Sequence, residues 1–161
     1  MQQRIIPNLW FDGESVEAAE FYTSIFPNSR IVSVAHYSEA GPGTAGSVMT
    51  VEFELDGQRI VAINGGPQFT FSEAVSLQID CADEDEVDHY WERLTDGGEE
   101  GQCGWLKDRY GLSWQVVPAG MDELFAGPDP QRAARAMQTM FGMRKLDLAA
   151  LHSAADGVAA A

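Results

Sequence analysis

Few side chains in this sequence are placed to do chemistry. The titratable residues that could act as an acid, a base or a nucleophile are His36, Glu52, Asp80 and Cys103. The sequence contains no G-x-S-x-G turn, no P-loop, no H-E-x-x-H pair and no close pairing of a cysteine with a histidine. Cys103 has no cation beside it in the sequence that would stabilise a thiolate. The motifs by themselves therefore indicate no reaction.

Composition excludes several classes of partner. The chain has 161 residues, 45% of them apolar, which is enough for one well-buried domain. Its net charge of −15 disfavours phosphate backbones, so we expect no nucleic-acid partner. No apolar run approaches the roughly 20 residues that cross a bilayer, so we expect no membrane partner. Cys81 and Cys103 are too few for a disulfide framework and have no metal-finger spacing, which favours a reduced, cytoplasmic protein.

The first half of the chain predicts a strand, a helix and three further strands. Ala18, Tyr22 and Ile25 fall on one face of a helix that ends at Pro27 and Asn28. The dipeptide at 56–57, Asp-Gly, is a hairpin signal, so the strands on either side of it should pair antiparallel. The strands expected are residues 5–11, 30–37, 47–55 and 58–64.

The second half repeats this pattern. The apolar face of a second helix has the same spacing as that of the first, with an aromatic pair in the middle of both. The two sets are Ala18, Phe21, Tyr22, Ile25 and Val87, Tyr90, Trp91, Leu94. A strand is expected before the second helix over 75–80, and hairpin strands after it around the turn Asp108–Gly111. The sequence therefore predicts two β-α-β-β-β modules.

Two later tracts complete the pattern. Near the end of the segment 101–118, Trp114 should pack under the helices, which places Ser113 and Gln115 on the opposite face of their strand. After it, helices are expected over 129–143 and 146–151. The apolar stripe of these helices needs a covering surface, and a second copy of the chain would supply one, so we expect a homodimer. The stripe is Met137, Met140, Phe141 and Leu146.

Five motifs together carry a family resemblance. They are PNLWFDG at 7–13, FYTSIFPNS at 21–29, EAGPG at 39–43, NGGP at 64–67 and GQCGWLKDRYGLSWQVVP at 101–118. With the repeated module, they resemble the PhnB-like branch of the vicinal oxygen chelate superfamily, often labelled a 3-demethylubiquinone 3-methyltransferase-type domain. The resemblance implies an α+β fold of two paired modules whose sheets curl around a cleft, with a C-terminal helical extension. We expect a single domain over 1–161, with modules at about 4–67 and 73–118 and helices at about 129–152.

The resemblance also implies where a metal would bind. In metal-dependent members each module supplies one ligand from its first strand and one carboxylate from its last strand. The last-strand positions fall here on Gln115 and near Ala62, and the first-strand positions fall on residues 7 or 8 and on residues 74, 75 or 76. These are Pro7 or Asn8, and Ala74, Val75 or Ser76. None is His, Asp or Glu, so we expect no metal and no cofactor.

The leading functional hypothesis is a metal-free cleft that binds a small organic ligand. Its candidate residues are Asn8, Trp10, His36, Asn64, Ser76 and Gln115. The first alternative is an enzyme, and the methyltransferase label belongs here, although no Gly-rich turn between a strand and a helix supports S-adenosylmethionine binding. The second alternative is an interaction protein whose cleft has lost its ligand. The sequence does not identify the ligand or the pathway.

Overall fold

The computed structural model describes residues 4–158. The chain divides into two compact units, residues 1–71 and 72–161. Each unit contains a four-stranded mixed sheet, so the fold is α+β, and the order of elements in the first unit recurs in the second. The predicted internal repeat is therefore confirmed. Among residues 4–158, no helix has both the length and the apolar character needed to cross a membrane.

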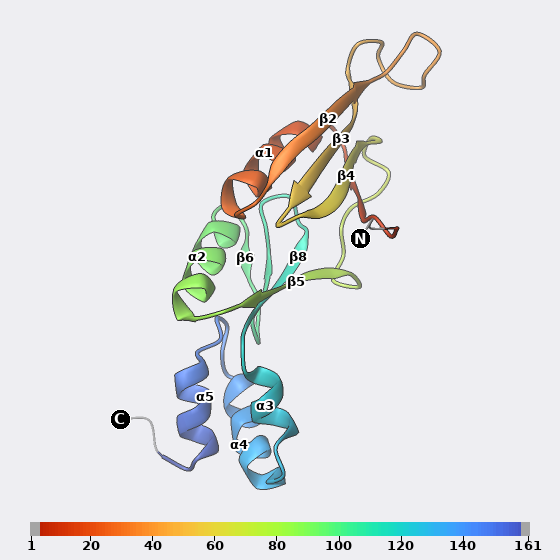
Figure 1. The fold of residues 1–161 in the computed structure, drawn as a ribbon. Coiled ribbons are helices and arrows are strands. Elements are labelled where there is room, and N and C mark those ends of the chain that lie inside the picture. The colour runs from red at the N-terminus through yellow and green to blue at the C-terminus, as the bar shows by residue number, and fades with distance from the viewer. Residues whose placement is uncertain (1–3, 159–161) are drawn as a thin grey trace. The chain divides into compact units, whose positions relative to one another are not determined.

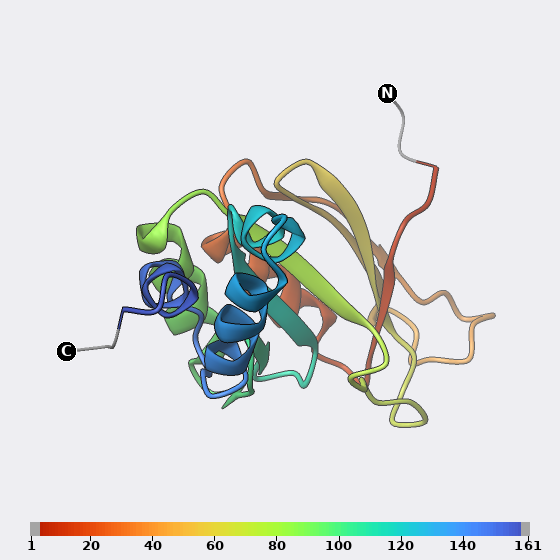
Figure 2. The same ribbon diagram turned by 90° about the horizontal axis from the view of Figure 1, so that it is seen from below.

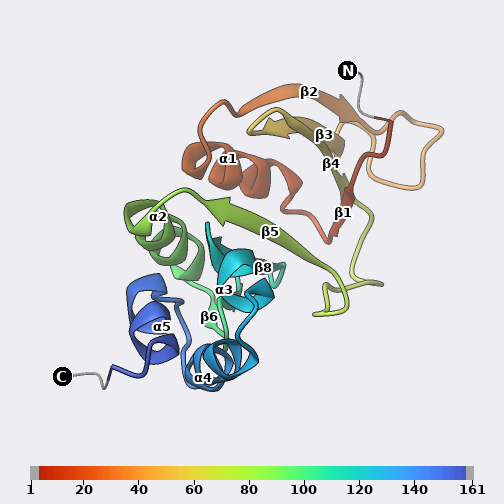
Figure 3. The same ribbon diagram turned by 60° about the horizontal axis from the view of Figure 1, so that its bottom comes forward.

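The first unit is one β-α-β-β-β module (Figure 1). Its elements are β1 (Asn8–Phe11), α1 (Ser15–Ile25), β2 (Arg30–His36), β3 (Val48–Leu55) and β4 (Gln58–Asn64). The strand order is β1-β4-β3-β2, in which β1 and β4 run parallel and the other neighbours antiparallel. Helix α1 lies along one face of this sheet (Figure 3).

The core of the first unit forms where α1 meets the sheet. Tyr22 of α1 is fully buried and its ring stacks at 6.2 Å on Phe53 of β3, which is buried as well. The first strand is shorter than expected. The strand expected from Ile5 begins at Asn8, and Ile5 is 88% exposed. Ala62 has no exposed surface, because it shares the buried face of the sheet with Val51, its partner on β3.

The second unit repeats the module. Its elements are β5 (Ser76–Cys81), α2 (Glu84–Thr95), β6 (Glu99–Glu100), β7 (Trp105–Lys107) and β8 (Ser113–Pro118), with the strand order β5-β8-β7-β6. Trp114 and Val116 are buried and β8 contacts α2, which confirms the alternation predicted for this strand. Helix α2 begins after Asp83, whose carboxylate caps it by accepting a hydrogen bond from the Glu86 amide at 3.0 Å.

A buried carboxylate organises the turn before β8. Asp108 is 3% exposed, and its Oδ1 accepts hydrogen bonds from the Tyr110 amide at 2.8 Å and the Leu112 amide at 3.1 Å. Its Oδ2 accepts from the indole Nε1 of Trp114 at 2.8 Å. Gly111, which closes the turn, has φ +83°, a conformation that glycine adopts without strain. The D-x-x-G sequence thus connects the turn directly to the core tryptophan.

Three helices follow β8. They are α3 (Met121–Ala126), α4 (Pro130–Met140) and α5 (Leu148–Ala155), and they pack on one another (Figure 2). The short helix α3 was not expected, because six residues are too few to show a clear helical period. The expected apolar stripe is divided by the fold: Leu146 is buried in the helical cluster and Met140 packs against it, whereas Met137 and Phe141 are 42% and 64% exposed.

Removing the Asp108 carboxylate should destabilise the second unit. Asp108→Ala leaves three donors without their acceptor, so we expect the free energy of unfolding to fall by about 3 kcal/mol or more. The stability of Asp108→Asn should lie between those of the parent and of Asp108→Ala. Its amide oxygen can still accept from the backbone amides, but its amide nitrogen cannot accept from the Trp114 indole. Urea titration of both variants measures this. The exposed Glu92→Ala should change stability by less than about 0.5 kcal/mol, and an equal loss there would contradict a special role for Asp108.

Candidate functional site

A pocket of about 570 Å³ lies in the first unit, where β4 ends and β3 begins. This volume is in the range of small-molecule sites in proteins. The turn after β1, the first turn of α1, the loop between β2 and β3 and the loop after β4 form its walls. Its polar lining residues are Asp12, Tyr37, Ser47, Asn64 and Gln68, its apolar ones are Val16, Pro42 and Val48, and the others are glycines.

Asn64 ties three parts of this pocket together. Its Oδ1 accepts a hydrogen bond from the Ser15 amide at 3.0 Å, so it fixes the start of α1. Its Nδ2 donates to the Val48 carbonyl at 3.2 Å, which fixes the start of β3. Its backbone carbonyl accepts from the Tyr37 hydroxyl at 2.8 Å. Asn64 was predicted as a ligand contact and does line the pocket, but its polar groups are largely engaged in holding the walls.

Trp10 supports the pocket from behind the loop that follows β4. Its indole Nε1 donates to the Gly66 carbonyl at 2.8 Å, and its ring meets Phe69 edge-on at 5.1 Å. The Gly65 backbone lies so close to the ring that a Cβ there would fall 2.0 Å from Trp10 Cζ2. Glycine is therefore required at position 65 by packing, and Trp10 acts as a support for the glycine wall.

Tyr37 is covered in the same way by the loop between β2 and β3. A Cβ at Gly43 would lie 2.5 Å from the Tyr37 ring, so this loop also depends on glycine for its close approach. The Tyr37 amide donates to the Ser47 carbonyl at 2.9 Å, and the Gly46 amide donates to the Tyr37 carbonyl at 2.9 Å. The loop is thus closed on Tyr37 by hydrogen bonds on both sides of the residue.

The electrostatics of the pocket disfavour anions. Asp12 is the charged side chain among the described lining residues, and it forms no ion pair within residues 4–158. A carboxylate without a counter-charge attracts hydrogen-bond donors and cations and repels anions, and the chain as a whole carries a net charge of −15. The pocket is therefore suited to a neutral or cationic molecule with donor groups.

The other candidate residues lie away from this pocket. Asn8 is exposed, and its Nδ2 donates to the carbonyl of Ile6 at 3.0 Å. His36 is exposed at the end of β2. Ser76 and Gln115 belong to the second unit, where the Gln115 Nε2 donates to the Ser76 hydroxyl at 2.9 Å. Of the six candidates, the structure thus brings Asn64 and Trp10 together around one pocket and pairs Ser76 with Gln115.

The Ser76–Gln115 pair lies on a polar face of the second sheet. The strand register places Ser113 and Lys107 on the same face, opposite the face that packs on α2. Lys107 pairs with Glu73 at 2.5 Å, which raises the pKa of the lysine and lowers the pKa of the glutamate. The Ser113 hydroxyl is buried and has no hydrogen-bond partner among residues 4–158. This face therefore has unused capacity for hydrogen bonding.

The donor set does not fit the metal of the superfamily. Gln115 offers a neutral amide oxygen, which is a poor ligand for a divalent transition metal, and Ala62 faces the core and offers no donor. Transition metals of this kind prefer imidazole and carboxylate ligands. Within residues 4–158, no group of three or more His, Cys, Asp or Glu side chains is arranged to hold a metal ion.

The four titratable candidates for catalysis are exposed or engaged. Glu52 lies 2.6 Å from the Nε of Arg59, and this contact raises the pKa of the guanidinium. Asp80 accepts a hydrogen bond from Gln78 at 2.7 Å. The Cys103 thiol donates to the Met140 carbonyl at 3.5 Å. None of these three residues, nor the exposed His36, lines the first-unit pocket.

Sequence reasoning missed several lining residues, Tyr37 and Asp12 among them. Tyr37 lies shortly before the motif EAGPG at 39–43, and Asp12 lies within the motif PNLWFDG at 7–13; both motifs carry the family resemblance. The two glycine-rich loops could have pointed to these residues, because a glycine in a loop often marks a place where the backbone lies close to a ring or a ligand.

Comparison with known proteins identifies similar sequences and structures. Residues 3–117 match the family described as 3-demethylubiquinone-9 3-methyltransferase. A Bacillus cereus PhnB protein, named provisionally as a 3-demethylubiquinone-9 3-methyltransferase, is 39% identical, and the match covers 73% of this chain and 100% of that chain with a TM-score of 0.67. No curated protein matches the sequence.

More distant structures share the fold alone. Protein PA1353 from Pseudomonas aeruginosa is 18% identical over 73% of this chain and 98% of that chain, with a TM-score of 0.61. The fosfomycin resistance protein FosX from Listeria monocytogenes, solved with Mn(II) and sulfate, is 15% identical over 76% of this chain and 94% of that chain, with a TM-score of 0.53. The expected superfamily fold is thereby confirmed.

Adding a methyl group at Gly65 should disrupt the pocket wall. Gly65→Ala forces a Cβ into the Trp10 ring, so we expect a loss of about 1–3 kcal/mol in the free energy of unfolding. Gly13→Ala is the matched control, because it lines the same pocket and its Cβ would meet no atom within 4 Å. Chemical denaturation measures both. Equal stability of the two variants would show that the glycine wall does not depend on this close contact.

Proposed function

The chain belongs to the 3-demethylubiquinone-9 3-methyltransferase family, the PhnB-like branch of the vicinal oxygen chelate superfamily, and on this premise we propose that it binds a small organic molecule without a metal. The observation that carries the proposal is the first-unit pocket, about 570 Å³ in volume, with convergent polar groups on largely preformed walls. The ligand that this pocket favours is a neutral or cationic molecule that donates hydrogen bonds, because Asp12 has no counter-charge. Ser76 and Gln115 remain proposed ligand contacts on the second sheet.

Binding is better supported than catalysis. A general acid or base must reach its substrate with a free titratable group. Glu52 is paired with Arg59, and Asp80 and Cys103 are engaged in hydrogen bonds. The pocket itself offers the Asp12 carboxylate and the Tyr37 hydroxyl, which donates a hydrogen bond to the backbone carbonyl of Asn64. Asp12 is thus a titratable group within the pocket, but the other one in the lining is engaged, so we propose that Asp12 orients a ligand.

The description of the family as a 3-demethylubiquinone-9 3-methyltransferase names a substrate and a reaction. The pocket is compatible with the substrate more than with methyl transfer. A demethylated ubiquinol head group is a neutral ring with hydroxyl donors, which is the chemistry that the pocket favours. S-adenosylmethionine enzymes of the Rossmann type use a Gly-rich turn between a parallel strand and a helix. Here β1 leads into α1 through Asp12, Gly13 and Glu14, and the Gly13 amide donates to the Glu14 carboxylate. We therefore propose recognition of such a ring rather than its methylation.

The homodimer and the cytoplasmic location also remain proposals. Met137 and Phe141 expose apolar surface one turn apart on or just after α4, and a second copy of the chain is the occupant that we propose. Cys81 and Cys103 are both free thiols, which is usual in a reducing compartment. A monomeric mass in solution would contradict the dimer.

Filling the first-unit pocket should abolish binding of a matching probe. We expect 2-methoxyphenol, a neutral donor ring, to shift the amide resonances of Gly13, Gly65 and Gly66 in protein NMR spectra. Val16→Trp places a large ring in the pocket and should weaken this binding at least about tenfold. Ser24→Trp is the control, because it adds the same ring at an exposed position of α1 outside the pocket.

A second probe tests the effect of the Asp12 charge on binding. The anion 2-methoxybenzoate should bind more weakly than 2-methoxyphenol, because Asp12 repels it. Equal binding of the anion, or full binding of 2-methoxyphenol to the Val16→Trp variant, would remove the basis of the proposal.

Metal ions should have no effect on the protein. Because the donor set does not fit a divalent transition metal, adding Mn(II) or a chelator should leave the melting temperature unchanged within error. The same additions should leave the affinity for 2-methoxyphenol unchanged. A stabilisation of several degrees by Mn(II), or a stoichiometric metal in the purified protein, would show that a metal site exists.

A further inference from the structure

A second pocket lies in the second unit, beside the helical extension. It has a volume of about 340 Å³, within the range of small-molecule sites. Ala82 and Glu84 at the start of α2 and Pro118 at the end of β8 form one side, and Leu148, Ala149 and His152 of α5 form the other. The family match ends at residue 117, so the α5 side of this pocket lies outside the matched residues. The family resemblance therefore does not account for it.

The segment before α5 is fixed to the module, so this pocket has preformed walls. The Cys103 amide donates to the Met143 carbonyl at 2.9 Å, and the Gly104 amide donates to the Arg144 carbonyl at 2.7 Å. Leu146 is buried and packs so close to Gly104 that a Cβ there would fall 2.9 Å from its side chain. Lys145 forms an ion pair with Asp88 of α2. Together these contacts hold α5 against the module.

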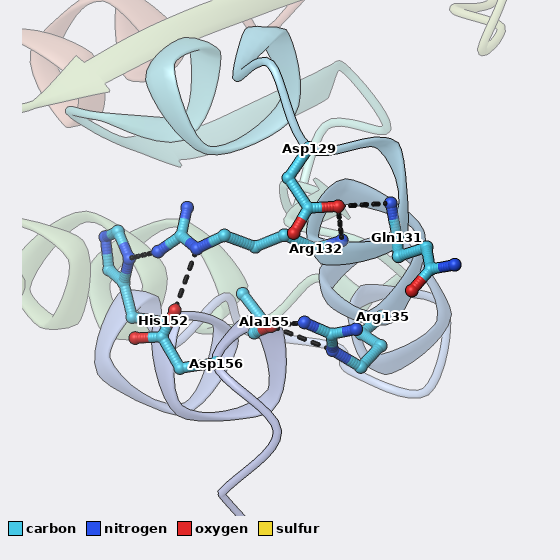
Figure 4. Close-up of polar contacts among 7 residues, drawn as sticks. All are labelled: Asp129, Gln131, Arg132, Arg135, His152, Ala155 and Asp156. Carbon is cyan, nitrogen blue, oxygen red and sulfur yellow. Dashed lines mark hydrogen bonds and ion pairs between the residues drawn. The ribbon is translucent and has the colours of Figure 1, made fainter.

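Within the extension, Arg132 fixes the orientation of His152 (Figure 4). The Arg132 Nε pairs with the Asp156 carboxylate at 2.8 Å, and its Nη2 lies 3.3 Å from the His152 Nδ1. The Arg135 guanidinium, which donates to the Ala155 carbonyl, ties the end of α5 to α4, and Asp129 caps the start of α4. The ring of His152 is therefore held from one side.

We assign the tautomer of His152 from this contact. A guanidinium carries only donors, so the Nδ1 that faces it must accept. In the neutral ring the proton then resides on Nε2, which becomes a donor. Nε2 has no hydrogen-bond partner among residues 4–158, and His152 lines the pocket. The pocket thus combines a largely apolar lining with the carboxylates of Asp83 and Glu84 and the Nε2–H of His152.

The carboxylates near the pocket restrict its ligand further. Asp83 and Glu84 both line it. Burial and the neighbouring charge of Asp147 raise the pKa of Glu84, an effect that Lys145 partly offsets. An anion would have to approach these acidic groups, so the N-terminus of α2 is a poor site for it here. A neutral ligand with an oxygen acceptor meets no such repulsion.

We propose that this pocket is a second binding site, for a small, neutral and mainly apolar molecule that presents a carbonyl oxygen to the Nε2 of His152. Leu148, Ala149 and Pro118 contact its apolar body. The site is independent of the first-unit pocket, since the two share no residue and lie in different units.

The test uses two probes of nearly equal shape. 4-Fluoroacetophenone carries the carbonyl oxygen, and 1-ethyl-4-fluorobenzene lacks it, so the affinity ratio from ¹⁹F NMR titration isolates the hydrogen bond. We expect the ketone to bind about fivefold more tightly to the full-length protein. His152→Phe keeps a ring but removes the donor, and should abolish this preference. The ketone should also shift the amide resonances of Ala82, Ala119 and Ala149.

Two variants test whether the probes bind in this pocket or elsewhere on the protein. Ala149→Phe fills the pocket and should eliminate binding of both probes, whereas Ser153→Phe adds the same bulk on α5 outside it and should not. Val16→Trp in the first-unit pocket should leave these shifts unchanged. The proposal is overturned if the ketone does not bind, if it binds the Ala149→Phe variant as tightly as the parent, or if its preference survives in His152→Phe.

Discussion

The first unit depends on one side chain, the amide of Asn64. It joins the last residue of β4 to the first turn of α1 and to the start of β3, and the backbone carbonyl of the same residue accepts a hydrogen bond from the Tyr37 hydroxyl. A sheet and a helix that meet at one point must satisfy their free backbone groups there, and an amide can both donate and accept. The same contacts set the positions of the walls around the pocket.

Two glycines, Gly65 and Gly43, also shape the walls of the pocket. The loops that follow β4 and β2 lie directly on the rings of Trp10 and Tyr37, at distances that leave no room for a Cβ at Gly65 or Gly43. The rings supply flat apolar surface, and the bare backbone supplies carbonyls and amides at the pocket. Three of the four motifs that carry the family resemblance in this unit therefore contribute to the pocket: PNLWFDG, EAGPG and NGGP.

In the second unit the buried carboxylate of Asp108 has a comparable structural role, since it joins the turn before β8 to the indole of Trp114. The face of that sheet opposite α2 keeps polar groups available at Ser76, Gln115 and Ser113. Helix α5 forms a second pocket with the start of α2 and the end of β8, and its lining is mainly apolar but includes His152 and two carboxylates. The two pockets thus favour ligands of different chemistry.

The sequence by itself determined the repeated module, the alternation around Trp114 and the family, because these follow from local periodicity and from motifs. It also identified Asn64 as a candidate ligand contact, which stays a prediction, and the structure adds that its amide holds the walls of the pocket. Only the tertiary structure decided that Tyr37 and Asp12 meet Asn64 at one pocket, and that Leu146 is buried while Phe141 is exposed. The physical reason is that pockets and covered faces arise from contacts between residues far apart in the chain, which periodicity does not record.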